Sequence, residues 1–155
     1  MRIIKYKTLL NKDKLNILVK ERSVNYQFEQ LNNPELIAQM MNDVFELNKQ
    51  SEEFLYIVAV NTKCKPIGVF EVSHGTVNNS FFSPREIFIK ALLTGAVYII
   101  LAHNHPSGDI TPSPDDVEAT KRIKEAGDLI GIGLLDHIIV GDQNYYSFKE
   151  NKLVL

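Results

Sequence analysis

The sequence of 155 residues predicts a mixed α/β (α+β) fold, with a central mixed β-sheet flanked by helices. Short apolar runs at residues 54–60 and 96–102 have the length and composition of buried strands. Segments of helical periodicity, several with clear helix-start residues, alternate with these runs. A chain of this length buries roughly 70% of its unfolded surface. We therefore expect one compact domain with a substantial core.

The first half of the chain predicts three strands and one helix. Residues 15–26 alternate loosely between apolar and polar side chains and predict the first strand. Asn33-Pro34-Glu35 opens a helix that runs to about residue 48. The apolar run that begins at Phe54 predicts a strand, and a turn then leads to an antiparallel partner at residues 67–72.

The second half predicts two further helices and three strands. Ser83-Pro84-Arg85-Glu86 has the pattern of a capping box, and it opens a helix that Gly95 closes. Ser113-Pro114-Asp115-Asp116 opens a second helix, with Ser at the N-cap, Pro at N1 and an acid at N3. The expected strands are residues 96–102, 134–140 and 145–148.

Composition argues against a membrane protein and against a secreted, disulfide-bonded protein. No stretch approaches the ~18 apolar residues of a membrane helix, so we expect no membrane association. The first residues lack the apolar core of a secretory signal, and the single Cys64 cannot form an intramolecular disulfide. Together these features favour a cytoplasmic protein. Residues 1–22 carry seven Lys or Arg and two acids, so residues 1–30 are expected to form a basic N-terminal strand or arm.

The most informative segment is His103-Asn104-His105, which lies between the strand at 96–102 and the helix that starts at Ser113. Residues i and i+2 at a strand end point to the same side, so His103 and His105 can converge while Asn104 points away. Asp116, in the first helical turn, can supply a third ligand, which would leave one position of a zinc ion open. Ser113 and Asp116 have a competing explanation as a plain capping pair.

The spacing His-x-His, seven residues, Ser, two residues, Asp resembles the JAMM motif of the JAB/MPN metalloprotease family. A segment similar to the RadC subgroup is Leu101-Ala102-His103-Asn104-His105-Pro106-Ser107-Gly108. The similarity continues at residues 83–86 and 134–137. The resemblance covers roughly residues 31–150 and implies a JAB/MPN-like domain at 31–155. It also implies Zn²⁺ held by His103, His105 and Asp116.

The same resemblance implies a metallopeptidase or isopeptidase, in which zinc-activated water attacks an amide carbonyl of a polypeptide or isopeptide-linked substrate. Ser113 would then help to hold the developing oxyanion. An upstream Glu would act as the base. Glu52 and Glu53 precede the strand, and adjacent side chains face opposite ways, so only one can face the metal. The family position relative to Phe54 favours Glu52.

Other histidines and other functions stay open. His74 is expected in a loop as a surface or hydrogen-bonded residue. Asp136 and His137 are either a satisfied pair near the core or a support for the zinc site. The alternative function is a non-peptidase metal-binding module in DNA repair or mobile-element metabolism, with nucleic acid as a partner. A zinc nucleobase deaminase is disfavoured, because the sequence lacks the His-x-Glu and Pro-Cys-x-x-Cys signatures.

Overall fold

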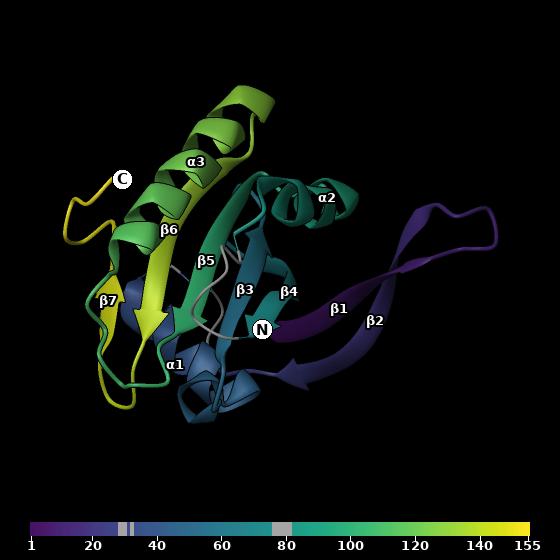
Figure 1. The fold of residues 1–155 in the computed structure, drawn as a ribbon. Helices are drawn as coiled ribbons and strands as arrows, with labels where there is room; N and C mark the ends of the chain where they lie inside the picture. Colours follow the sequence, from purple (N-terminus) through teal and green to yellow (C-terminus); the bar gives the residue numbers. More distant parts are fainter. Residues whose placement is uncertain (28–30, 32, 76–81) are drawn as a thin grey trace.

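The computed structural model describes residues 1–27, 31, 33–75 and 82–155. Seven strands form one mixed sheet in the order β2-β1-β4-β3-β5-β6-β7, and helices cover both of its faces (Figure 1). The predicted mixed α/β class is therefore confirmed. The strands are β1 (Arg2–Leu10), β2 (Asn16–Asn25), β3 (Glu53–Val60), β4 (Pro66–Gly75), β5 (Tyr98–Asn104), β6 (Gly133–Val140) and β7 (Tyr145–Ser147). The helices are α1 (Pro34–Phe45), the short 3₁₀ turn η1 (Leu47–Lys49), α2 (Pro84–Thr94) and α3 (Pro114–Ile130).

The central strands are buried on both faces, and strand alternation divides the core into two clusters. Tyr56 and Val58 of β3 pack in the cluster that contains the apolar side of α1. Leu55 and Ile57 pack in the other cluster, beside buried residues of α2 and α3 such as Ile123. Side chains at odd positions of β3 and β5 thus share a face with α2 and α3. At the end of β5, odd-numbered residues therefore point toward the face covered by α2 and α3, and even-numbered residues point to the opposite face.

Helix α1 is shorter than expected. It ends at Phe45, because Glu46 adopts a left-handed conformation with φ of 49° and interrupts the helical hydrogen bonds. Residues Leu47–Lys49 then form a separate 3₁₀ turn, so the predicted end at residue 48 was wrong by about one turn.

The capping box predicted at Ser83 is not formed. The Ser83 side chain makes no capping hydrogen bond, although α2 begins at Pro84 and ends before Gly95 as predicted. The Glu86 carboxylate instead pairs with the side chains of Arg85 at 2.7 Å and Lys90 at 3.9 Å. The nearby cations thus compete successfully with the N-cap amide for this carboxylate.

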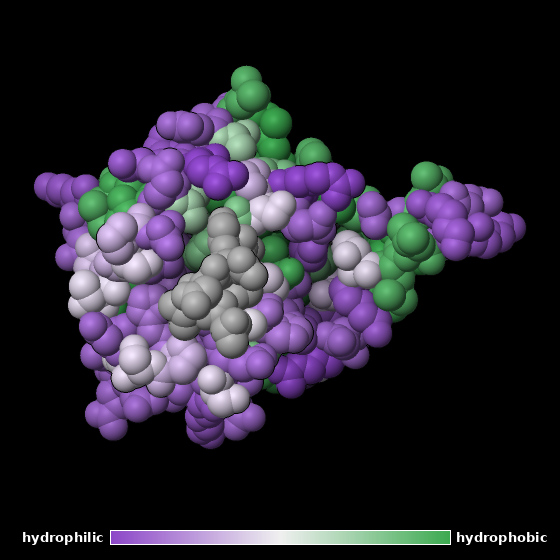
Figure 2. Space-filling model, in the orientation of Figure 1, coloured by the Kyte–Doolittle hydropathy of each residue, from purple (hydrophilic) through white to green (hydrophobic). Residues whose placement is uncertain are grey.

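The basic N-terminal segment is a hairpin, of which only the second strand was predicted. Its inner end belongs to the sheet, since Ile3 is buried and Lys5 pairs with Val69 of β4. The outer end projects from the body and carries exposed apolar side chains, including Leu10 and Leu15 (Figure 2). The predicted domain boundary at residue 30 lies outside the described residues. Among the described helices, none has the length and apolar character needed to cross a membrane.

Candidate metal centre

Two histidines converge at the carboxyl end of β5. His103 is the penultimate residue of β5 and His105 follows the strand end, so both side chains leave the same face. Their Nε2 atoms lie 3.0 Å apart. Asp116, at the third position of α3, brings Oδ1 to 3.4 Å from His103 Nε2 and Oδ2 to 3.4 Å from His105 Nε2. The structure thus brings together the three predicted ligands.

These spacings fit a tetrahedral zinc site. Ligand atoms about 2.0–2.1 Å from a zinc ion lie about 3.3 Å from one another in a tetrahedron. The two Nε2 atoms lie 3.0 Å apart, and each lies 3.4 Å from a different oxygen of Asp116, so the separations scatter around that value. A fourth group, the Glu53 carboxylate, belongs to the same cluster, but its Oε1 is 4.0 Å from His103 Nε2. The spacing of His103, His105 and Asp116 is therefore closer to that of tetrahedral zinc ligands than the spacing of Glu53 is.

The orientation of His105 follows from one hydrogen bond. Its Nδ1 lies 2.6 Å from the carbonyl oxygen of Asp109, which can only accept, so Nδ1 carries the proton. In the neutral ring Nε2 then presents a lone pair to His103 and Asp116. The loop between β5 and α3 thereby sets the tautomer that a metal ligand requires.

The helix cap and the ligand role of Asp116 are compatible, which resolves the competition expected from the sequence. Ser113 and Asp116 do form a capping box. The Ser113 backbone N–H and its hydroxyl both donate to Asp116 Oδ2, at 2.8 and 2.7 Å. Oδ1 is the oxygen that lies beside His103. Asp116 therefore holds the cap through Oδ2, which also lies 3.4 Å from His105 Nε2, and keeps Oδ1 beside His103.

The structure places Glu53, and not Glu52, at the site. Leu55 of β3 lies directly opposite His103 of β5, so these two side chains share a face. Glu53 is two residues before Leu55 and falls on the same face, whereas Glu52 precedes the strand and is exposed. The prediction that Glu52 faces the site was wrong, because it relied on motif position and the register of β3 against β5 cannot be seen in the sequence.

Burial and mutual charge shape the ionisation of this cluster. Burial lowers the pKa of the fully buried His103 ring to about 4. The hydrogen bond with Asp116 raises the pKa of His105 despite partial burial. Burial alone would raise the pKa of Asp116, but bonds from His105 and Ser113 and the charge of His103 hold it far below its ordinary value. Burial raises the pKa of Glu53, against the opposing charge of His105, which is the direction that a general base near neutral pH requires.

Two buried polar residues, His137 and Thr120, lie behind His103. His137 on β6 is fully buried, and its Nε2 lies 2.8 Å from His103 Nδ1. Its Nδ1 lies 2.6 Å from the hydroxyl of Thr120 on α3. Of the two roles left open for His137, the contact favours support of the site. Thr120 was missed, since a single threonine within a helix carries no sequence signal of such a contact.

His74 lies on β4 and not in a loop as expected. Its Nδ1 is 2.9 Å from Glu71 Oε1, and its ring stacks on Phe54 with centroids 5.0 Å apart. The expectation of a hydrogen-bonded histidine is thus confirmed, but on a strand. It does not belong to the metal-site cluster.

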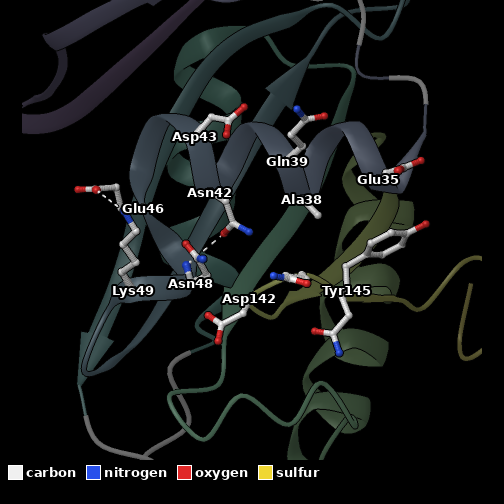
Figure 3. Close-up of a pocket in the computed structure, with 12 residues that line it drawn as sticks. Glu35, Ala38, Gln39, Asn42, Asp43, Glu46, Asn48, Lys49, Asp142 and Tyr145 are labelled. Carbon is white, nitrogen blue, oxygen red and sulfur yellow. Dashed lines mark hydrogen bonds and ion pairs between the residues drawn. The ribbon is translucent and has the colours of Figure 1, made fainter.

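A polar hollow lies elsewhere on the described part of the chain. It has a volume of about 600 Å³ and lies between α1 and the turn that joins β6 to β7 (Figure 3). Its lining is polar, with Asn42, Asp43 and Asp142 among the side chains, and it includes none of the residues of the metal-site cluster. Two of its lining residues are joined by a hydrogen bond from the backbone N–H of Asn48 to Oδ1 of Asn42.

Comparisons with known proteins show the family of the chain. The family model for the RadC-like JAB domain matches residues 31–153. A UPF0758 protein of Clostridium beijerinckii is 41% identical over 133 residues, which covers 86% of this chain and 57% of that protein. A UPF0758 protein of Alkaliphilus oremlandii is 47% identical over 115 residues, covering 74% of this chain and 48% of that protein. The chain thus spans about half the length of these curated relatives. With the family match, the fold and the histidine–aspartate cluster in agreement, the chain belongs to the RadC-like JAB domain family.

Proposed function

We propose that the chain is a zinc-dependent hydrolase of amide bonds, a metallopeptidase or isopeptidase of the RadC-like JAB type. The observation that carries this proposal is the placement of a second, partly buried carboxylate beside the three converging ligand atoms. A structural zinc site needs four protein ligands, whereas a catalytic one keeps a position open and a base close by. Glu53, with Oε1 at 4.0 Å from His103 Nε2, meets the second description.

Each residue has a distinct role in this proposal. Zinc bound by His103, His105 and Asp116 would act as a Lewis acid and lower the pKa of water toward ~7. Glu53 accepts the proton of the attacking water and returns it to the leaving amine, and its pKa is raised in the direction this needs. Ser113 donates to the oxyanion that develops on the carbonyl, for which its hydroxyl must turn away from Asp116 Oδ2.

The substrate class is a polypeptide or an isopeptide-linked conjugate. The single Cys64 is a free thiol, and we propose a reducing location, the cytoplasm.

The test uses the metal-free protein reconstituted with one equivalent of zinc and assayed on peptide and isopeptide-linked substrates. Glu53→Gln should keep its zinc and lose at least about 100-fold in turnover, since it retains size and loses basicity. Glu52→Gln is the matched control, because it changes the neighbouring, exposed carboxylate. Full turnover by Glu53→Gln, or a loss of turnover seen only in Glu52→Gln, would contradict the role of Glu53.

A second candidate is a metal-binding module that acts on or beside nucleic acid. The basic hairpin favours it, since residues 1–22 carry a net charge of +5 and its outer end projects from the body. Binding of this kind should weaken steeply with salt. Two results together would favour this candidate over the hydrolase. The protein would bind stoichiometric zinc without hydrolysing any amide. It would also bind DNA in a salt-dependent manner, and charge reversal at Lys12 and Lys14 would abolish that binding.

A further inference from the structure

A chain of three hydrogen bonds joins two of the proposed ligands through the protein interior. The Thr120 hydroxyl lies 2.6 Å from the backbone carbonyl of Asp116 and 2.6 Å from His137 Nδ1. The other nitrogen of His137, Nε2, lies 2.8 Å from His103 Nδ1. Thr120, His103 and His137 are all fully buried, so water cannot substitute for a missing partner.

The direction of every proton in this chain follows from its Asp116 end. A carbonyl oxygen can only accept, so the single hydroxyl proton of Thr120 goes to Asp116. Thr120 Oγ1 is then the acceptor for His137 Nδ1–H. A neutral imidazole carries one proton, so His137 Nε2 has a lone pair and accepts from His103 Nδ1–H.

The last step leaves His103 with a lone pair on Nε2, the atom that faces His105 and Asp116. The opposite direction would put a proton on His103 Nε2 and make it useless as a ligand. It would also require Thr120 to donate to His137 and leave the Asp116 carbonyl oxygen without its 2.6 Å partner. The chain of bonds thus selects one of the two neutral tautomers of His103.

Aromatic packing holds the middle of the chain in place. The His137 ring stacks on Phe148, with centroids 4.6 Å apart and an angle of 16° between the planes. Phe82 makes T-shaped contacts with both histidine rings, with its ring centroid 5.5 Å from that of His137 and 5.7 Å from that of His103. These contacts restrict rotation of the rings, so the hydrogen bonds keep their assigned atoms.

We propose that Thr120 and His137 are positioning residues that hold His103 in the Nδ1-protonated tautomer and so present Nε2 to the metal. This inference rests on the proposed metal centre. It adds that the hydrogen bonds already hold His103 in the metal-binding tautomer in the metal-free protein. Groups behind a metal ligand typically change metal affinity by about 10- to 100-fold when they are lost.

The test reads the tautomer directly, by ¹⁵N NMR of the histidine rings in the metal-free full chain above pH 8. We expect His103 in the wild-type protein to carry its proton on Nδ1. Thr120→Val keeps the shape of the side chain but removes the hydroxyl, so His103 should become a mixture of tautomers. Thr120→Ser, the matched control, keeps the hydroxyl and should restore the single form. Zinc affinity, measured by chelator competition, should fall about 10- to 100-fold in Thr120→Val and stay within a few fold of wild type in Thr120→Ser.

The outcomes separate this proposal from the proposed function. A wild-type His103 with its proton on Nε2 overturns the positioning role, and this spectrum is recorded on the wild-type protein alone. An unchanged tautomer and unchanged zinc affinity in Thr120→Val also overturn it, while the metal centre stands. Absence of zinc binding by the wild-type protein overturns the metal centre, whereas the tautomers still decide whether the hydrogen-bonded chain acts as described.

Discussion

Asn104 ties the end of β5 to the start of β3: its Oδ1 accepts a hydrogen bond from the backbone N–H of Phe54 at 2.8 Å. Its Nδ2 donates to the carbonyl of Glu52 at 3.0 Å. The side chain is buried and lies on the face opposite the two histidines, as strand alternation predicts. Because these bonds flank Glu53, Asn104 sets the position of the proposed base.

Asn104→Leu should therefore damage the site more than the fold. The change leaves the Phe54 N–H and the Glu52 carbonyl without their side-chain partner, which should cost about 1–3 kcal/mol of stability by urea denaturation. Turnover should fall further than this loss explains, with zinc content unchanged, since Glu53 loses its anchor and the three ligands do not. Asn61→Ala, which removes a similar Asn contact from an exposed turn, is the control and should leave turnover intact. Equal turnover in the two variants would refute a positioning role for Asn104.

Ser113→Ala tests the dual use of the helix cap. The change removes the bond from the Ser113 hydroxyl to Asp116 Oδ2 and the one that this hydroxyl accepts from the Asp116 N–H, at 2.7 and 3.1 Å. We expect a loss of about 1 kcal/mol in thermal or urea unfolding. If Ser113 also serves the oxyanion, turnover should drop on the order of 100-fold, well beyond the effect on stability. Ser113→Thr keeps the hydroxyl and should preserve both; a turnover of Ser113→Ala that matches the wild type would leave only the capping role.

The metal-free protein should lose stability as the pH falls. His103 has a folded pKa of about 4 against an ordinary value of 6.5, because its ring is buried. Burial also lowers the pKa of His137. A depressed pKa contributes stability above the unfolded value, and this contribution is lost as the pH falls from about 6.5 toward 4. For His103 the gap corresponds to about 3 kcal/mol.

The raised pKa of His105 acts in the opposite direction, and its contribution is present at low pH and lost as the pH rises through the folded value. The raised pKa of Glu53 acts in the same direction as that of His105. Urea denaturation between pH 8 and 4 should still show a net fall in the free energy of unfolding, because the pKa shifts of the fully buried His103 and His137 are the larger ones. In His137→Phe the slope of this fall should be smaller. A metal-free protein that gains stability toward pH 4 would contradict the assignment of two buried, neutral histidines.

Removal of the metal should lower stability without unfolding the chain. Both faces of the sheet carry extensive apolar clusters that do not depend on the site. Zinc at 100 times its dissociation constant adds about 2.7 kcal/mol, which corresponds to about 5–10 °C in Tm for a chain of this size. Thermal melts with and without chelator should show two cooperative transitions separated by that interval. A chelated protein without any cooperative transition would mean that the core alone is insufficient.

The sequence predicted the local part of the site and missed the part that depends on long-range register. His103 and His105 share a face through strand alternation, and Ser113 with Asp116 forms a cap, so both pairs follow from neighbours in the chain. The choice between Glu52 and Glu53 depends on how β3 pairs with β5, a contact between residues about fifty positions apart. No local pattern encodes that pairing.

The same limit explains the two other omissions. The contacts of His103 with His137 and of His137 with Thr120 join three separate elements, β5, β6 and α3. The early end of α1 results from a single left-handed residue, Glu46, which has no Gly or Pro signal. Propensity and periodicity describe the elements, but the packing that selects such details is a property of the whole domain.

The most direct test of the metal centre is anomalous diffraction at the zinc edge from crystals of the zinc-loaded protein. We predict one strong peak per chain, within about 2.3 Å of His103 Nε2, His105 Nε2 and an oxygen of Asp116. The Glu53 carboxylate should lie outside that ligand distance. The absence of a peak at these three atoms, or a peak coordinated by another set of side chains, would contradict the account.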